Sequence, residues 1–195
     1  MYPSHTYVHV DGLVDYYERL AGATDLPLVL YKRGDEADRE VLDALSKHDD
    51  YVACKWAVDD VEGFASTAAY VDGDLVWLDG IAERFAPAFA LEGAEGITTG
   101  IGNFVPELSL ELMDAIREAD WEQARELREL ARRFQEIRGQ VEGSTSVGVV
   151  KHGMDIAGYY GGPVRPPLKP MAEQYREQVE DAYDDLTDEL EVAAD

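Results

Sequence analysis

The chain has 195 residues, with 41 acidic against 17 basic side chains and a formal net charge of −24. This charge excludes a nucleic-acid-binding surface, because binding to phosphates depends on clustered Lys and Arg. Apolar residues make up 46% of the chain, which excludes an acidic disordered chain and predicts a folded protein with a large core. Only five of the basic residues are lysines. A surface with so many acidic side chains and so few lysines indicates adaptation to high salt, because salt screens the repulsion between the acidic side chains.

The cysteine and histidine content limits the chemistry further. A single cysteine, Cys54, excludes an intramolecular disulfide and favours a reducing compartment. The first residues show no export signal, and no apolar stretch approaches 18 residues. We therefore expect a soluble, cytoplasmic protein without a membrane segment. The four histidines are scattered without the spacing of metal ligands, and the sequence predicts neither a metal nor a cofactor.

Four short apolar runs predict the strands of a parallel sheet. They are too continuous for half-exposed strands and too short for helices, so we expect strands buried on both faces at residues 26–31, 51–56, 75–78 and 96–101. Helix-like segments alternate with them at residues 38–47, 59–70 and 82–92. Counted from Pro27, Tyr51, Leu75 and Gly96, the strands begin 21 to 24 residues apart, which is the length of a compact βα unit. One further helix, at residues 11–21, precedes the first strand.

The chain becomes entirely helical after the fourth run. Helices are predicted at residues 106–119, 121–137, 147–159 and 171–190, with a Gly- and Pro-rich break at 158–167. Asp120 and Gln123 are placed to cap the second of these helices. We expect βα units over residues 1–105 and a helical extension over 106–195 that packs on the same domain, because no low-complexity linker separates them.

Lys55 is the most informative residue, since it interrupts the apolar run 51–56. Burial of an ammonium group is costly unless the group is paired or loses its proton, and a neutral amine is a nucleophile that forms Schiff bases with ketones. Parallel barrels also place catalytic groups at strand ends. The alternative is an edge lysine that reaches solvent. Lys151 is the competing lysine, but its neighbours predict an amphipathic helix.

Two further features lie at predicted strand ends. Tyr31 ends the first run, where its phenol could lie beside the amine of the adjacent strand and relay protons; ordinary packing is the alternative. The turn at residues 98–103 offers hydroxyls and backbone N–H groups that could hold a carboxylate. Neither feature is specific by itself.

Taken together, these residues resemble the dihydrodipicolinate synthase and N-acetylneuraminate lyase superfamily. The resemblance is carried by Tyr31, Lys55, the Leu78-Asp79-Gly80 turn and the segments 96–103 and 164–168. It is closest to the sugar-acid dehydratase branch represented by 5-dehydro-4-deoxyglucarate dehydratase. In that branch Asn-Arg follows the tyrosine, where this chain has Lys32-Arg33, and the segments 103–107 and 162–168 look nearly unchanged. The resemblance extends over residues 1–171.

The resemblance implies a Schiff-base lyase on a (β/α)8 barrel with a C-terminal helical extension. Lys55 would attack the C2 ketone of a 2-oxo acid, and Tyr31 would relay protons. Elimination of a hydroxyl from the enamine gives dehydration, whereas cleavage of a carbon–carbon bond gives an aldolase that releases pyruvate. The predicted substrate-binding residues are those that match the carboxylate end of the family's site and its flank: Thr98, Thr99, Gly80 and Asn103.

The chain departs from the family because the first four βα units are missing, including the Gly-Thr-Thr-Gly-Glu type loop that binds the 2-oxo carboxylate. A full barrel takes about 250 residues. We therefore expect an α/β fold with strands five to eight of a partial (β/α)8 barrel. Residues 2–10 would be the remnant of the loop after strand four, in a truncated gene or in one of two complementing chains.

Two functions remain open at this point. The first is a dehydratase or aldolase that acts on a 2-keto-3-deoxy sugar acid and is incomplete alone. The second is a non-catalytic remnant or assembly subunit of the same family. A small 2-oxo acid is the expected partner, with no nucleic acid or membrane. Association into a homo-oligomer is also expected, because an open four-stranded sheet exposes its edges and its interior face.

Overall fold

The computed structural model describes residues 9–34 and 38–194, so the predicted loop remnant lies outside the described residues up to residue 8. The chain forms two compact units that divide between Thr98 and Thr99.

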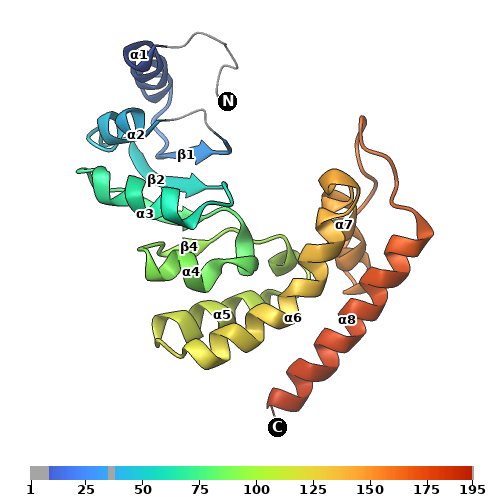
Figure 1. Ribbon diagram of the computed structural model, residues 1–195. Helices are drawn as coiled ribbons and strands as arrows, with labels where there is room; N and C mark the ends of the chain where they lie inside the picture. Colours follow the sequence, from blue (N-terminus) through green and yellow to red (C-terminus); the bar gives the residue numbers. More distant parts are fainter. Residues whose placement is uncertain (1–8, 35–37, 195) are drawn as a thin grey trace. The chain divides into compact units, whose positions relative to one another are not determined.

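The first unit contains a parallel sheet whose strands follow chain order (Figure 1). This confirms the four predicted strands and their direction. The strands are β1 (Leu28–Lys32), β2 (Tyr51–Trp56), β3 (Val76–Asp79) and β4 (Gly96–Ile97).

The fourth strand is shorter than predicted, and its second half is not a strand. The Thr98 N–H still donates to the Asp79 carbonyl over 2.9 Å. Because β3 ends at Asp79, the chain beyond Thr98 has no further partner in that strand, and Ile101 begins a 3-10 helix, η2 (Ile101–Asn103).

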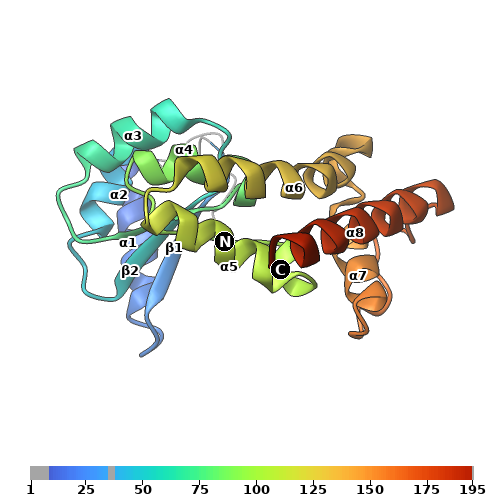
Figure 2. The same ribbon diagram turned by 90° about the horizontal axis from the view of Figure 1, so that it is seen from below.

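The helices of the first unit are α1 (Val10–Ala21), α2 (Arg39–Leu45), α3 (Val61–Tyr70) and α4 (Ala86–Leu91). Figure 2 shows α2, α3 and α4 on one side of the strands. The helix predicted at residues 82–92 is divided: a 3-10 turn, η1 (Ala82–Arg84), precedes α4. Phe85 leaves the helical region with φ −122°, and Pro87 lies in the first turn of α4. Proline favours such a start because its ring fixes φ and it has no N–H to donate.

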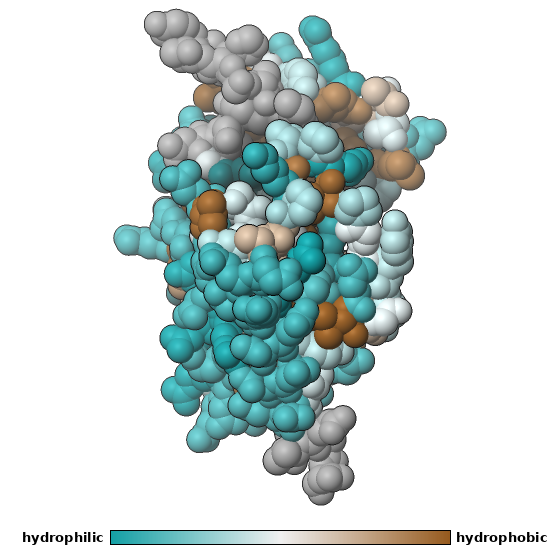
Figure 3. Space-filling view, turned by 90° about the vertical axis from the view of Figure 1, so that its right-hand side faces the viewer, coloured by the Kyte–Doolittle hydropathy of each residue, from teal (hydrophilic) through white to brown (hydrophobic). Residues whose placement is uncertain are grey.

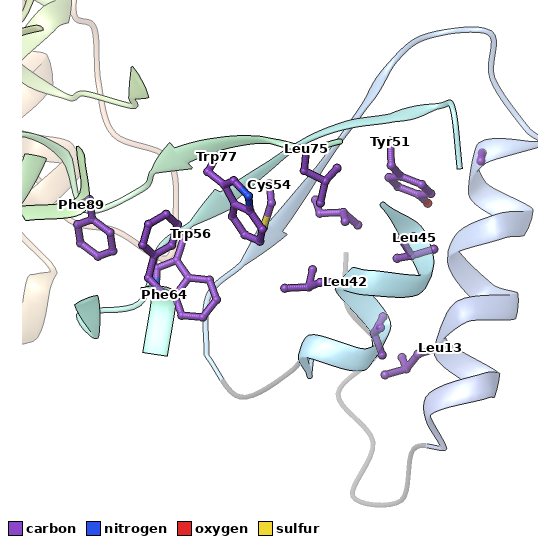
Figure 4. Close-up of a cluster of buried hydrophobic side chains, with 13 residues drawn as sticks. Leu13, Leu42, Leu45, Tyr51, Cys54, Trp56, Phe64, Leu75, Trp77 and Phe89 are labelled. Carbon is purple, nitrogen blue, oxygen red and sulfur yellow. The ribbon is translucent and has the colours of Figure 1, made fainter. Parts of the chain in front are cut away.

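Aromatic rings fill the core between the sheet and its helices (Figure 4). Phe64 of α3 is fully buried. Its ring centroid lies 5.7 Å from that of Trp56, 5.5 Å from that of Trp77 and 5.2 Å from that of Phe89, all in edge-to-face geometry. Leu30 and Cys54 extend the same core beneath the strands. These contacts fix one face of the sheet.

The opposite face of the sheet is open, so the expectation of strands buried on both faces is wrong. Side chains alternate between the faces of a strand, and Val29, Tyr31 and Val76 remain 52%, 54% and 43% exposed. A continuous apolar run therefore marks a strand with two apolar faces, but it does not ensure that both faces are covered.

The second unit consists of helices. After η2 come α5 (Pro106–Arg117), α6 (Trp121–Gly139), the short η3 (Val141–Gly143), α7 (Ser146–Ile156) and α8 (Glu173–Ala194). Helix α6 packs against α5, α7 and α8. The predicted cap is present, since Asp120 Oδ1 accepts the Gln123 N–H over 3.1 Å. Helix α8 begins two residues later than predicted because the Ala172 carbonyl accepts its first hydrogen bonds, from Tyr175 and Arg176.

The face of the molecule in Figure 3 is mostly hydrophilic, with separate hydrophobic patches. Among the helices of the described residues, none combines the length and apolar content that a membrane crossing requires.

Candidate active site

Tyr31 and Lys55 lie side by side on the open face of the sheet. They are register partners across the β1–β2 pair, and the Lys55 Nζ lies 4.3 Å from the centroid of the Tyr31 ring. Lys55 is half-buried, whereas Tyr31 is exposed. The two side chains that the sequence singled out are therefore brought into direct contact.

An irregularity in the strand pairing creates this contact. Leu28 pairs with Tyr51, but the next residue, Val29, pairs with Ala53, so Val52 has no register partner in β1. An extra residue of this kind re-aims the side chains that follow it. Without the shift, Tyr31 would face Cys54, whose thiol is buried on the helix side. The shift places Lys55 opposite Tyr31 and on the open face.

The surroundings of Lys55 are apolar along the sheet and acidic beyond its end. Its partner in β3 is Leu78, which pairs in turn with Gly96 of β4. Within the described residues Lys55 forms no ion pair. Its charge interacts with the buried carboxyl of Asp79 at a longer range. Among the residues that the structure describes, the amine thus lies beside a phenol ring and an apolar row and forms no ion pair with a carboxylate.

Asp79 is a buried acid that the sequence predictions did not include among the site residues. It ends β3 and is fully buried. Burial raises its pKa to about 7, against the opposing effect of the Ile81 N–H, which donates to Oδ1 over 2.6 Å; the nearby buried Glu83 raises the pKa further. Oδ2 has no hydrogen-bond partner within the described residues. The signal for it in the sequence is an aspartate that directly ends an apolar run.

Gly80 and Thr98 lie at the carboxyl ends of β3 and β4. The Gly80 N–H donates to the Trp56 carbonyl over 2.7 Å, and a Cβ on Gly80 would meet that same carbonyl oxygen at 2.7 Å. Only glycine allows so close an approach of two strand ends. The Thr98 Oγ1 donates to the Asp79 carbonyl over 3.4 Å. Both predicted residues therefore lie at the same end of the sheet as Tyr31 and Lys55, each of which stands one residue before the end of its strand.

Thr99 and Asn103 belong to the second unit, where they shape the turn before α5. The Thr99 Oγ1 accepts the Gly102 N–H over 3.0 Å and lies 3.3 Å from the Ser109 hydroxyl. The Asn103 Nδ2 donates to the Gly100 carbonyl over 3.0 Å. Their role in substrate binding stays a prediction.

The competing lysine has a different environment. Lys151 lies in α7, as its neighbours predict, and its Nζ donates to the Gly161 carbonyl over 2.6 Å. This bond holds the amine at a loop of the second unit. Within the described residues, no group of three or more His, Cys, Asp and Glu side chains is placed to hold a metal ion.

Comparisons with known proteins identify the family of the chain. Residues 2–186 match the model of the dihydrodipicolinate synthetase family. The chain is 33% identical over 162 residues to a probable 5-dehydro-4-deoxyglucarate dehydratase of Methylobacterium radiotolerans, covering 80% of this chain and 53% of that protein. It is 30% identical over 169 residues to an uncharacterized DapA-like lyase of Halobacterium salinarum, covering 84% and 54%.

Solved structures show the same likeness at the level of the fold. Dihydrodipicolinate synthase from Oceanobacillus iheyensis superimposes with a TM-score of 0.87 at 26% identity, covering 94% of this chain and 62% of that one. The enzyme from Bacillus clausii gives a TM-score of 0.87 at 26% identity, covering 95% and 64%. The chain thus spans about half the length of the curated relatives it matches. With a parallel sheet that makes up part of a (β/α)8 barrel and a match over nearly its whole length, the chain belongs to the dihydrodipicolinate synthetase family.

Proposed function

We propose that this chain carries the nucleophile of a Schiff-base-forming lyase that acts on a 2-keto-3-deoxy sugar acid. The observation that supports this most directly is the contact between the Lys55 amine and the Tyr31 ring on the open face of the sheet. An amine beside a phenol has both groups that imine chemistry on a ketone requires, a nucleophile and a proton carrier. The name of the Methylobacterium relative supports the dehydratase class.

The reaction would begin with attack of the Lys55 Nζ on the C2 carbonyl carbon. Tyr31 would supply a proton to the carbonyl oxygen, and loss of water leaves an iminium. Loss of a C3 proton converts the iminium to an enamine, and in a dehydration the enamine expels the C4 hydroxyl, which takes up a proton and leaves as water. In an aldol cleavage the iminium keeps its C3 proton: the C4 hydroxyl loses its proton, the C3–C4 bond breaks to release an aldehyde, and the enamine that remains takes up a proton at C3 and becomes an imine again. Hydrolysis of the imine then releases the product and restores the amine.

Reductive trapping tests this proposal. Incubation with pyruvate followed by borohydride should fix the ligand on Lys55 as a stable secondary amine, detected by intact mass and peptide mapping. Lys55→Arg keeps the charge but cannot form an imine, so the adduct should be lost. Lys151→Arg is the matched control and should trap as well as the unmodified protein. An undiminished adduct in Lys55→Arg would contradict the proposal.

Tyr31→Phe separates the two proposed roles. The variant keeps the ring that contacts Lys55 and removes only the hydroxyl. We expect turnover to slow by about 100-fold, and imine formation, which also uses a proton from this hydroxyl, to slow less. A variant in which neither step slows would show that the hydroxyl carries no proton.

The open sheet face favours a second candidate, an assembly subunit without activity of its own. Its exposed apolar side chains, among them Val29 and Val76, are typical of an interface that another polypeptide covers. Absence of any adduct, in both low and molar KCl, would favour this candidate over the lyase.

A further inference from the structure

The second unit contains a cavity of about 300 Å³ lined by α7, α8 and the loop that joins them. Figure 1 shows this loop as it leaves α7 and returns to the start of α8. Lys151 and His152 precede Asp155 by four and three residues, so the three side chains lie on one face of α7. Arg176 lines the cavity from the beginning of α8. Charged groups of two helices therefore meet at one hollow.

The loop wall of the cavity is fixed to α7 at Gly161. The Gly161 N–H donates to Asp155 Oδ1 over 2.8 Å, and the Gly161 carbonyl accepts a hydrogen bond from Lys151 Nζ over 2.6 Å. A Cβ at this position would collide with the Lys151 carbonyl oxygen, so the loop approaches the helix this closely because residue 161 is a glycine. Lys151 and Asp155 thus hold the wall in place, and the cavity is preformed.

Arg176 brings the largest set of hydrogen-bond donors to the cavity. Its side chain is half-buried, and its guanidinium lies 3.8 Å from the exposed carboxylate of Glu173, an ion pair that is too long for a hydrogen bond. Within the described residues, the guanidinium donates no hydrogen bond. Because a guanidinium has five N–H donors in a fixed fork, Arg176 can bind an acceptor that enters the cavity.

The charge of this cavity differs from that of the rest of the chain. Its lining has three basic side chains and one acidic side chain, Asp155, whereas the whole chain has 41 acidic and 17 basic residues. The hollow lined by α5, α6 and α8 shows the opposite pattern, with five glutamates and one arginine. The cavity at α7 is therefore rich in basic groups on a strongly negative protein, which favours an anionic ligand.

The remaining wall of the cavity is apolar. Val164 and Met171 of the loop line it together with two prolines. Such a wall favours apolar groups because their burial removes them from water, and ligand pockets combine apolar walls with a few polar groups that fix the orientation of the ligand. The lining therefore suits a molecule with one negatively charged end and an apolar body.

We propose that this cavity binds a small organic acid, whose carboxylate is held by Arg176 and whose apolar body lies against Val164 and Met171. A carboxylate accepts two parallel hydrogen bonds from a guanidinium, and the volume suits an apolar body of about the size of a phenyl ring. The inference goes beyond the proposed function, since every residue that lines the cavity belongs to the second unit. It requires no reaction at Lys55.

Benzoate and benzamide test the site as a matched pair, because they share the ring and the shape and differ in charge. Each is titrated into the full chain at one KCl concentration, and the imidazole proton signal of His152, which lines the cavity, is followed by NMR. We expect benzoate to shift this signal with half-saturation at about 1 mM, and benzamide to bind about ten-fold more weakly. The net charge of −24 repels benzoate, so a preference for it reports a local cation.

Variants assign that preference to Arg176. Arg176→Gln should weaken benzoate binding about ten-fold and leave benzamide binding unchanged. Arg132→Gln is the matched control, because Arg132 is an exposed arginine of α6 in the same unit, and it should keep the full preference. Asp155→Asn removes the acid of the lining and keeps an acceptor for the Gly161 N–H, so benzoate should bind a few-fold more tightly.

The outcomes decide this inference separately from the proposed function, because the titration does not use the Lys55 amine. A saturable benzoate shift that Arg176→Gln weakens and Arg132→Gln does not would support the site. Equal binding of benzoate and benzamide, benzoate binding that survives Arg176→Gln, or the absence of a saturable shift would overturn it. Asp155→Asn gives a second test that leaves Arg176 in place, and benzoate binding that does not tighten in this variant would also overturn the site.

Discussion

The two faces of the sheet in the first unit differ in burial: one is packed against helices, and the other is open. On the helix face, Leu30, Cys54 and Trp77 are buried in a core of packed aromatic rings. On the open face, neighbouring positions of the same strands present Tyr31 and Lys55. Adjacent residues of one strand, Cys54 and Lys55, thus face the core and the proposed site respectively. The difference teaches that packing against helices holds one face of each strand, while the other face is left to present polar side chains.

Shortening a buried side chain on the helix face should cause the largest loss of stability. Phe64 is fully buried against three aromatic rings, so Phe64→Ala should lower the free energy of unfolding by about 3–5 kcal/mol. Val29 on the open face is 52% exposed, and Val29→Ala should cost less than about 1 kcal/mol. Urea denaturation at one salt concentration measures both. Similar losses for the two variants would mean that the open face is packed as tightly as the core.

Asp79, the buried acid at the end of β3 on the helix face, should make the stability depend on pH. Asp79 has a pKa of about 7 in the folded chain and an ordinary value near 3.9 when unfolded. Between these values the folded state holds a proton that the unfolded state releases, so stability falls as pH rises from about 4 to 7 and stays low above 7. Asp79→Asn keeps an acceptor for the Ile81 N–H and should raise stability at pH 8 by on the order of 2 kcal/mol.

Asp43 provides a control, because its carboxyl group should change the stability with pH in the opposite direction. A hydrogen bond from Lys47 lowers its pKa, helped by the N–H of Asp72. A lowered pKa contributes stability above the unfolded value and loses it as pH falls through the folded value. Asp43→Asn should therefore destabilise the protein at neutral pH, by less than about 1 kcal/mol because the pair is solvent-exposed. Matching pH profiles for the two variants would show that Asp79 has no raised pKa.

Salt should stabilise the whole chain. With a net charge of −24, self-repulsion is screened within about 3 Å at 1 M salt. The melting temperature, followed by circular dichroism, should rise as KCl increases from low to molar concentration. A flat or falling melting temperature would count against adaptation to high salt.

Labelling of the Cys54 thiol tests the packing of the helix face without a mutation. Burial raises the pKa of the Cys54 thiol to about 12, and thiols react as thiolates. A disulfide reagent should leave the folded protein unmodified over hours and label it within seconds in urea. Rapid labelling of the native protein would show that the helix face opens under native conditions.

Much of the first unit could be predicted from the sequence because local patterns determine it. The apolar runs and their spacing locate the strands, and the charged residue inside the run 51–56 identifies Lys55. The early end of β4 could not be predicted, because it depends on where its partner β3 ends. The open face was missed for a similar reason: burial depends on which elements are present to cover a strand.

The sequence predicted Tyr31 and Lys55 as the central residues of the site, but it did not predict the buried acid near them. The proximity of Tyr31 and Lys55 follows from neighbouring strands, but their contact depends on the register shift at Val52, which no residue type signals. Asp79 was named only as part of the turn after the third run, and its burial could not be predicted because it depends on the elements that cover the end of β3.

The reactivity of the open face can be measured most directly by comparing all five lysines in one sample. The protein is treated with pyruvate and borohydride in molar KCl, and the label is quantified by peptide mapping at Lys32, Lys47, Lys55, Lys151 and Lys169. The account predicts that most of the label is on Lys55 at short times. A label spread evenly over the five lysines, or found mainly on Lys151, would contradict it.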